Sequence, residues 1–283
     1  MKENGLLELQ QVTVKPTLWG EGQQVLPILN DVSIRIDKGQ FITLLGRNGS
    51  GKSTLAKVIA GLWTTGVTGK IVQRAETTAY GNRIPMVMQQ PEAAMVGATP
   101  WEDVVLMLEQ NEIEASHIIS LAEQALRQVG MSERMHQSIE TLSGGQKQLV
   151  AIAGCLAVHS PLLVLDEVTS MLDPETAEIV LERVRSIHKS GVTVIWITQK
   201  LEELRQGDRI VAMNDGRIVY DGLADGWFTR SFSGNSESVC EQLGFEAPYS
   251  ARVAWELEQL GFRLRPFPYT ADMLAEAVKR YER

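Results

Sequence analysis

The stretch of sequence that most constrains the fold of this chain is GRNGSGKST, which runs from Gly46 to Thr54. It fits the spacing G-x-x-x-x-G-K-[ST], follows a predicted strand and opens a predicted helix. Glycines at this spacing let successive backbone N–H groups converge on phosphate oxygens, and the start of the helix adds the positive end of its dipole. We therefore predict a phosphate-binding loop formed by Gly46, Asn48, Gly49, Ser50, Gly51, Lys52, Ser53 and Thr54.

Two side chains of this loop and a second motif carry the expected chemistry. Lys52 is predicted to reach the β- and γ-phosphates of a nucleotide, and the Ser53 hydroxyl to ligate Mg²⁺. The second motif, LLVLDE at Leu162–Glu167, is an apolar strand that ends in two carboxylates. We expect Asp166 to hold the Mg²⁺ shell through water and Glu167 to orient or deprotonate the attacking water. The alternative is that both acids are simply solvated at the end of a strand. The catalytic interpretation is favoured because the same chain has the phosphate-binding loop.

Apolar runs of strand length alternate with helical patterns along most of the chain. Strands are predicted at Leu7–Val14, Val32–Ile36, Phe41–Leu45, Arg83–Met88, Leu162–Leu165, Val192–Ile197, Ile210–Met213 and Ile218–Tyr220. Helices are predicted at Lys52–Gly61, Trp101–Leu108, His117–Val129, Gly145–Val158, Pro174–Lys189 and Leu201–Arg205. Continuous apolar strands that alternate with helices predict an α/β fold with a parallel sheet covered on both faces, to which the first strands add an antiparallel part.

The composition of the chain changes after Gly222. The stretch SFSGNSES, Ser231–Ser238, is small and polar and is predicted to be a linker. Beyond it, short helices broken by prolines are expected at Val239–Leu243, Ala251–Leu260 and Ala271–Tyr281. We therefore predict a main domain over residues 6–229 and a small C-terminal appendage over residues 237–283.

The charge balance and the cysteines limit the function classes. The formal net charge is −8, which disfavours DNA or RNA as the main partner, because counterion release requires clustered Lys and Arg. Cys155 and Cys240 lie in helix-like apolar stretches without metal-binding spacing, so we expect buried, reduced thiols in a cytoplasmic protein. The N-terminus lacks the apolar stretch of a signal peptide, and the longest apolar runs fall short of the roughly 18 residues of a membrane span.

A third motif, LSGGQKQ at Leu142–Gln148, precedes a long apolar-periodic helix. With it, the sequence resembles the ATP-binding cassette (ABC) ATPases, whose signature is LSGGQ. The resemblance implies their P-loop NTPase fold, with an antiparallel β subdomain and a helical signature subdomain at about residues 90–158. It also implies a dimer that holds ATP and Mg²⁺ between two chains, where the γ-phosphate bound by the partner is capped by Ser143, Gly144, Gly145 and Gln146. A helix-capping serine followed by flexible glycines is the alternative for SGG alone.

Two weaker elements extend the resemblance. Gln89 in VMQQP matches the Q-loop glutamine of the family, which contacts Mg²⁺ or water and couples the site to membrane subunits. SMLD, Ser170–Asp173, matches the D-loop that crosses the dimer interface, which places Asp173 among the expected nucleotide-site residues. The adenine-stacking aromatic of the family falls near residue 16, where this chain has Pro16, and Trp19 is a candidate substitute.

A closer resemblance lies in VMQQPEAAMVGATPWEDVVLMLEQ, Val87–Gln110, which is similar to the Q-loop region of the energy-coupling factor (ECF) transporter ATPases. Gln90, Ala94 and Leu149 depart from the Asn, Gln and Arg that are usual there. The tail Leu243–Phe262 resembles the C-terminal segment that helps to hold two such ATPases together. The resemblance implies a peripheral subunit on the cytoplasmic face of the membrane that powers import of a vitamin or metal ion. Its implied partners are a second ABC ATPase, a transmembrane coupling subunit and a substrate-binding membrane subunit.

The chain departs from the ABC pattern at ITQKLEEL, where Gln199 stands in place of the switch histidine of the family. A glutamine amide donates a hydrogen bond to a γ-phosphate oxygen but cannot become cationic. Exchanging a charge-assisted bond for a neutral one loses roughly 1–2 kcal/mol, which is on the order of 10-fold in rate if the bond tightens in the transition state. The neighbouring Lys200 is expected to point elsewhere. We therefore predict a slow ATP site built from Lys52, Asp166, Glu167 and Gln199.

Two alternatives to a transport ATPase follow from the same motifs. One is a regulatory nucleotide-binding partner whose own site hydrolyses negligibly because of Gln199. The other is a soluble, non-transport ABC ATPase, which the single cassette and the lack of a heptad run disfavour.

Overall fold

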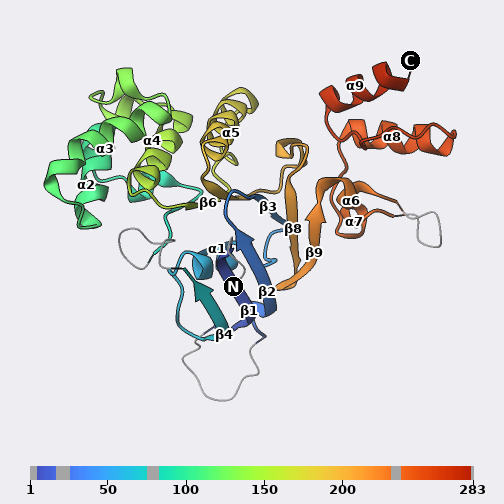
Figure 1. Ribbon diagram of the computed structural model, residues 1–283, viewed down its shortest axis with the longest axis horizontal. Helices are drawn as coiled ribbons and strands as arrows, with labels where there is room; N and C mark the ends of the chain where they lie inside the picture. Colours follow the sequence, from blue (N-terminus) through green and yellow to red (C-terminus); the bar gives the residue numbers. More distant parts are fainter. Residues whose placement is uncertain (1–4, 17–25, 75–82, 231–236, 282–283) are drawn as a thin grey trace.

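The computed structural model describes residues 5–16, 26–74, 83–230 and 237–281 (Figure 1). An antiparallel sheet forms near the N-terminus of the chain, with spatial order β2-β1-β4. Its strands are β1 (Gly5–Val14), β2 (Leu29–Asp37) and β4 (Val67–Gln73). This sheet is the predicted antiparallel addition, with β4 as a further strand.

A second sheet carries the predicted motifs. Its spatial order is β5-β6-β7-β3-β8-β9, and its neighbouring strands are parallel except for the antiparallel pair β8 and β9. The strands are β3 (Phe41–Gly46), β5 (Met86–Val87), β6 (Leu162–Asp166), β7 (Thr193–Ile197), β8 (Arg209–Asn214) and β9 (Arg217–Leu223). The carboxyl ends of the parallel strands therefore meet along one edge, where ligands bind in open α/β sheets.

The parallel sheet is covered on both faces, as its continuous apolar strands predict. The covering helices are α1 (Lys52–Ile59) on one face and α4 (Gly144–Ala157) with α5 (Pro174–Lys189) on the other. β6 shows the alternation directly. Leu163 and Leu165 pack in the core that contains α4 and α5, whereas Leu162 and Val164 pack in the core shared with α1 and the antiparallel sheet.

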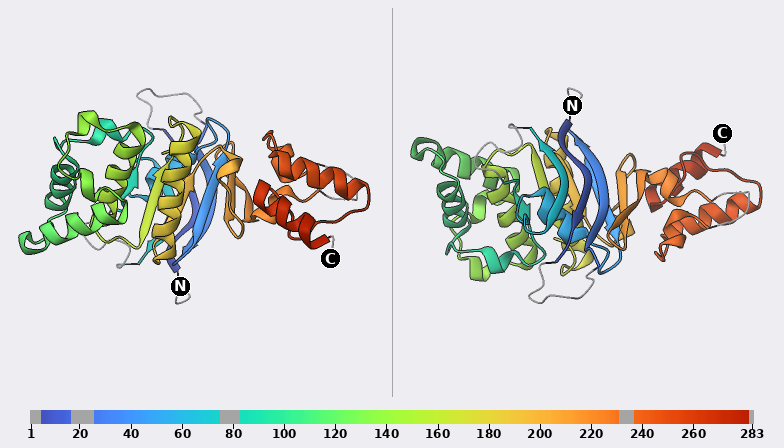
Figure 2. Two further views of the ribbon diagram at one scale, coloured as in Figure 1. Left: turned by 90° about the horizontal axis from the view of Figure 1, so that it is seen from above. Right: turned by 90° about the horizontal axis from the view of Figure 1, so that it is seen from below.

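The helical subdomain and the C-terminal appendage lie at opposite ends of the molecule (Figures 1 and 2). The helical subdomain packs α2 (Pro100–Gln110) and α3 (Ala115–Gln128) against α4. The appendage follows α6 (Ala224–Phe228) and contains α7 (Val239–Gln242), α8 (Tyr249–Gln259) and α9 (Ala271–Tyr281). Its core is continuous with the main domain, because Trp255 and Tyr269 share one apolar cluster with Leu45 and Ile210. Most of the predicted linker, residues 231–236, lies outside the described residues.

Several predicted elements require correction. The strand expected at Arg83–Met88 is only the two-residue β5, and the helix expected at Leu201–Arg205 is a 3-10 turn, η5 (Leu201–Glu203). The turn stops because Leu204 is extended and fully buried in the appendage core. β4 and α6 were not predicted, since β4 is mostly exposed and lacks an apolar run and α6 is a single short turn of helix.

The cysteines and the membrane expectation are also tested by the structure. Cys155 and Cys240 are free and buried, as predicted. Burial raises the pKa of each thiol to about 12. Within the described ranges, no helix combines the length and the apolar character that crossing a membrane requires.

Candidate nucleotide-binding site

The predicted phosphate-binding loop joins β3 to α1 at the carboxyl edge of the parallel sheet. Gly46 is required by close approach, because a Cβ there would lie 2.4 Å from Ser50 Oγ and 2.7 Å from Met213 O. Gly51 is the N-cap of α1 and has a φ of 101°, a left-handed conformation that favours glycine. The two glycines therefore hold the backbone in a tight turn that opens directly onto the helix.

A cavity of about 330 Å³ lies over this loop. It is lined by residues from separate parts of the sequence, which are Ile28, Asn48, Gly49, Ser50, Gly51, Lys52, Ser53, Thr54, Gln89, Asp166 and Glu167. The neighbouring strands β5 and β6 bring Gln89 and the two carboxylates to the loop. Ile28 was missed, because an isolated apolar residue before a strand gives no signal. The structure thus unites three motifs that the sequence presents separately.

Lys52 is held inside the loop by backbone carbonyls. Its Nζ donates to Gly46 O at 2.8 Å and to Arg47 O at 3.2 Å, and it lies 3.6 Å from Glu167 Oε1. Burial lowers the pKa of Lys52, and the negative charges of Glu167 and Asp166 oppose that effect. The ammonium therefore lines the cavity between backbone carbonyl acceptors and two carboxylates, where a phosphate can compete with the carbonyls for it.

Asp166 ends β6 at the edge of the cavity and is only 7% exposed. Burial raises the pKa of its carboxyl, and a hydrogen bond with the Ser53 side chain opposes that shift. Among the described residues, Asp166 Oδ1 is buried without a hydrogen-bond partner. An unpartnered carboxylate oxygen, a hydroxyl and the Gln89 amide are hard oxygen donors of the kind that Mg²⁺ takes. The described residues contain no group of three His, Cys, Asp or Glu that would form a metal cage of their own.

Glu167 and Gln199 meet above the loop. Glu167 has a φ of 49°, an uncommon conformation for a side-chain-bearing residue, and its N–H donates to Ile197 O at 3.0 Å. Gln199 Nε2 donates to Glu167 Oε1 and to Asn48 Oδ1, both at 2.8 Å. Lys200 points elsewhere, as expected, since its Nζ donates to Thr169 O at 2.8 Å. The amide at position 199 therefore connects the phosphate-binding loop to the carboxylate that follows β6.

The signature residues lie apart from this cavity in the same chain. Ser143 caps α4 and forms a capping box with Gln146, in which Gln146 N donates to Ser143 Oγ and Ser143 N donates to Gln146 Oε1. Asp173 caps α5 by accepting from Thr176 N at 3.0 Å. None of the predicted signature residues, nor Asp173, lines the loop cavity.

Gln89 lies between two cavities. It lines the loop cavity and also a second cavity of about 430 Å³, together with Gln90, Pro91, Glu92, Ala93, Gly144, Gln148, Met171 and Leu172. Its Nε2 donates to Ser170 Oγ at 3.0 Å, and its carbonyl accepts from Gln148 Nε2 at 3.2 Å. Trp19, the predicted adenine-stacking candidate, lies outside the described residues.

Comparisons with known proteins place this geometry in a family. The family model for ABC transporters matches residues 29–170. The energy-coupling factor transporter ATP-binding protein EcfA1 of Geobacillus kaustophilus is 35% identical over 88% of this chain and 90% of its own length, and that of Bacillus subtilis is 35% identical over 98% of each. A dimeric ATP-binding cassette in a post-hydrolysis state, bound to ADP and Pi, is 25% identical with a TM-score of 0.64, covering 77% of this chain and 98% of that one. The chain belongs to the ABC transporter family and, within it, to the energy-coupling factor transporter ATP-binding proteins.

Proposed function

We propose that this chain binds and hydrolyses ATP in the loop cavity and thereby powers an ECF-type importer of a vitamin or metal ion. The observation that carries the proposal is that Lys52, Asp166 and Glu167 line one cavity over the phosphate-binding loop. Gln199 does not line this cavity but donates to two residues that do, Glu167 and Asn48. The loop from Gly46 to Thr54 holds the phosphates through backbone N–H groups, and Lys52 exchanges its carbonyl partners for phosphate oxygens.

Glu167 supplies the acid–base function in this proposal. Its carboxylate lies between Lys52 and Gln199, which orient it toward the cavity. Glu167 orients the attacking water and accepts its proton, while Lys52 and Gln199 donate to the phosphate oxygens on which charge accumulates. Ser53, Gln89 and Asp166 are the residues that would hold Mg²⁺. The chemistry that the cation supplies when bound is neutralisation of phosphate charge.

The position of the signature residues supports a dimeric working unit. Ser143, Gly144, Gly145 and Gln146 begin α4 away from the chain's own cavity, so we propose that they cap ATP bound by a second ABC ATPase subunit, with Asp173 at the interface. The first turn of a helix offers free N–H groups to an anion. We further propose that residues 237–283 help to hold the two ATPases together.

The second cavity supports a membrane partner. It is lined by the segment that follows β5, by the start of α4 and by Met171 and Leu172, and it shares Gln89 with the nucleotide cavity. We propose that a transmembrane coupling subunit docks there, with the chain at the cytoplasmic face of the membrane and a separate membrane subunit capturing the transported solute. The movement that accompanies closure of the ATP-bound dimer is then transmitted to the membrane partner through Gln89.

A second candidate function rests on Gln199. Because its neutral amide replaces a cation-forming side chain, the site of this chain is slow, and a partner ATPase carries most of the turnover by using Ser143 and Gly145 of this chain in trans. The limiting case of this reading is a regulatory subunit that binds ATP and hydrolyses it negligibly. Intact Glu167 favours a slow site over an inactive one.

The test is steady-state ATP hydrolysis by the complex that copurifies with this chain from membranes. Glu167→Gln is expected to abolish the activity of this chain's site, whereas Glu202→Gln, an exposed glutamate in the loop after Gln199, serves as the matched control. If Glu167→Gln lowers ATP hydrolysis only slightly while transport still requires ATP, the regulatory subunit is favoured. A complex without membrane subunits would overturn the transport assignment.

A further inference from the structure

The loop that follows Gln199 is fastened to the segment that follows Glu167. Thr169 Oγ1 donates to Glu203 Oε1 at 2.5 Å, and Lys200 Nζ donates to Thr169 O at 2.8 Å. Thr169 is thus held through both its hydroxyl and its carbonyl by residues of one short loop. The sequence did not single out this contact, which joins residues 34 positions apart.

The fastening is built around a buried carboxylate. Glu203 is 5% exposed and Thr169 is 1% exposed. Glu203 Oε2 accepts from Trp196 Nε1 at 2.8 Å, so each carboxylate oxygen has one neutral donor. Hydrogen bonds to an ionised acceptor are roughly twice as strong as those between neutral groups. A buried carboxylate that loses a hydrogen-bond donor is destabilised, because it has also lost its hydration. The hydrogen bonds of Glu203 to Thr169 and Trp196 are therefore costly to break.

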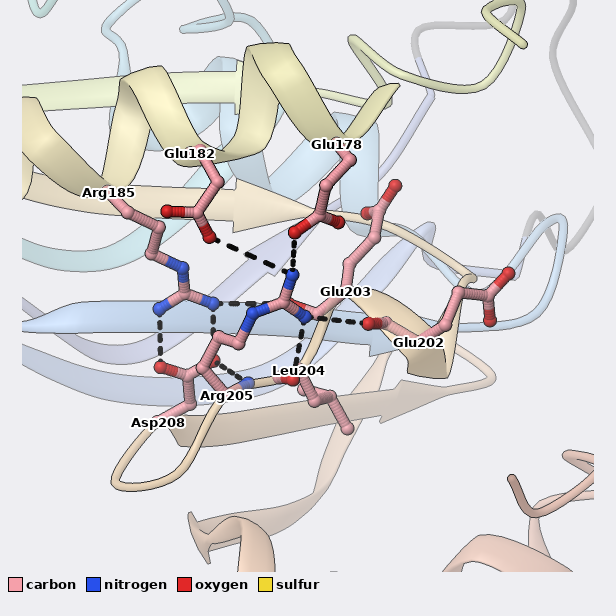
Figure 3. Close-up of polar contacts among 8 residues, drawn as sticks. All are labelled: Glu178, Glu182, Arg185, Glu202, Glu203, Leu204, Arg205 and Asp208. Atoms are coloured by element: carbon pink, nitrogen blue, oxygen red, sulfur yellow. Dashed lines mark hydrogen bonds and ion pairs between the residues drawn. The ribbon is translucent and has the colours of Figure 1, made fainter. Parts of the chain in front are cut away.

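The other side of the same loop is tied to α5 (Figure 3). Arg185 donates to Glu203 O at 3.2 Å and to both oxygens of Asp208, at 2.6 Å each. Figure 3 shows the Arg205 guanidinium between the same segment and α5, where it donates to Glu178. The segment from residue 203 to residue 208 is therefore fixed to α5, while Glu203 extends its side chain toward Thr169.

These contacts, together with the chain between them, form a closed ring that includes Glu167 and Gln199. Glu167 lies two residues before Thr169, and Gln199 lies four residues before Glu203. The contact between Gln199 Nε2 and Glu167 Oε1, at 2.8 Å, closes the ring on the cavity side. A sliding of one loop past the other by about 1 Å would break the buried bond to Thr169, since hydrogen bonds weaken steeply with distance.

From this arrangement we propose that Glu203 and Thr169 are a positioning pair for ATP hydrolysis. Their buried hydrogen bond sets the spacing between Gln199 and Glu167 as they act on the γ-phosphate and the water. Neither residue lines the nucleotide cavity. The inference rests on the proposed function of Glu167 and Gln199, and it predicts an effect on turnover rather than on nucleotide affinity.

The critical comparison is Thr169→Val against Thr169→Ser. Valine has nearly the shape of threonine but lacks the hydroxyl, whereas serine keeps the hydroxyl and lacks the methyl. In the complex purified from membranes, Thr169→Val is expected to lower kcat about 10-fold, since a charge-assisted bond is lost. The KM for ATP is expected to change by less than about twofold, because no ground-state contact to ATP is removed. Thr169→Ser is expected to retain kcat near wild type.

Trp196→Phe is the control for a purely structural role. It removes the other donor to Glu203 but leaves the bond to Thr169, so it is expected to lower thermal stability while kcat stays within about twofold of wild type. Equal loss of kcat in Trp196→Phe and Thr169→Val, or an unchanged kcat in Thr169→Val, overturns the positioning role. Glu167→Gln run in parallel separates the two proposals. If it leaves hydrolysis intact, the proposed function itself fails, whereas loss only in Glu167→Gln sinks the positioning pair alone.

Discussion

The side-chain amide of Gln199 donates a hydrogen bond to Glu167, with 2.8 Å between Nε2 and Oε1. The second N–H of the same amide donates to Asn48 Oδ1 in the phosphate-binding loop. Both donors are thus engaged by neighbouring side chains, and donation to a phosphate requires that one of these bonds be exchanged. Position 199 therefore links the two halves of the hydrolytic site, although its residue type departs from the family pattern.

Replacing Gln199 with histidine is expected to accelerate single-turnover ATP hydrolysis by the assembled complex. A protonated imidazole donates a charge-assisted bond, stronger by roughly 1–2 kcal/mol than the neutral amide bond, which corresponds to on the order of 10-fold in rate. Gln199→Ala, which removes the donor, is expected to slow the reaction further. An unchanged or slower rate in Gln199→His contradicts the idea that the glutamine limits this site.

Gly145→Ala is expected to destabilise the contact between α4 and α5. A Cβ at this position would lie 2.2 Å from Thr176 Cγ2, so the Thr176 side chain or the helix that carries it must shift, at a cost of about 1–3 kcal/mol. Urea unfolding of the full chain measures the loss. Gly144→Ala is the matched control, because its Cβ meets only Leu172 Cδ2, at 3.3 Å. Adding Thr176→Ala to Gly145→Ala should restore part of the stability, and a double variant as unstable as the single one would refute the steric explanation.

The nucleotide cavity could be predicted from the sequence because each of its motifs is local. A glycine-rich loop between a strand and a helix, and a strand ending in two acids, have geometries that follow from short-range sterics and from the common carboxyl edge of a parallel sheet. The order of the strands brought Gln89, Asp166 and Lys52 together as expected. Their catalytic roles stay predictions until they are tested by substitution.

The positioning pair could not be predicted, because it depends on the geometry of one turn. The sequence has two adjacent glutamates, and an α-helix predicted from Leu201 gives no reason to choose between them. In the structure, the 3-10 turn η5 buries Glu203 and leaves Glu202 exposed. The reach to Thr169 then follows from the packing of β7 against β6, a long-range arrangement without a sequence signature.

Breaking the buried ion pair between Arg185 and Asp208 is expected to cost more stability than breaking the more exposed pair between Arg209 and Asp221. Both side chains are buried, at 9% and 4% exposure. Asp208→Asn leaves the guanidinium buried without its counter-charge, so the free energy of unfolding should fall by about 3–5 kcal/mol in urea. Asp221→Asn, which breaks the more exposed pair with Arg209, should cost about 0–1 kcal/mol. Equal losses in the two variants would contradict the role of burial.

The last prediction concerns acid stability and the start of the C-terminal appendage. Glu241 pairs with Arg230, and its Oε2 also accepts from Ser238 N at 2.8 Å. The hydrogen bond from Arg230 is the main cause that lowers the pKa of Glu241 to about 2, from an ordinary value of 4.5. Because the folded-state pKa is the lower one, the stabilisation is fully present above pH 4.5 and is lost as the pH falls toward 2.

Glu241→Gln is expected to test this linkage. At neutral pH the variant should lose about 1–3 kcal/mol of unfolding free energy. The lower end of this range applies if solvent screens the partly exposed pair strongly. The difference from wild type should shrink as urea titrations are repeated from pH 5 to pH 3. Glu246→Gln, an exposed glutamate of the same appendage, should show little difference at any pH. A Glu241→Gln deficit that stays constant over this range would show that the carboxylate charge is not what stabilises the start of α7.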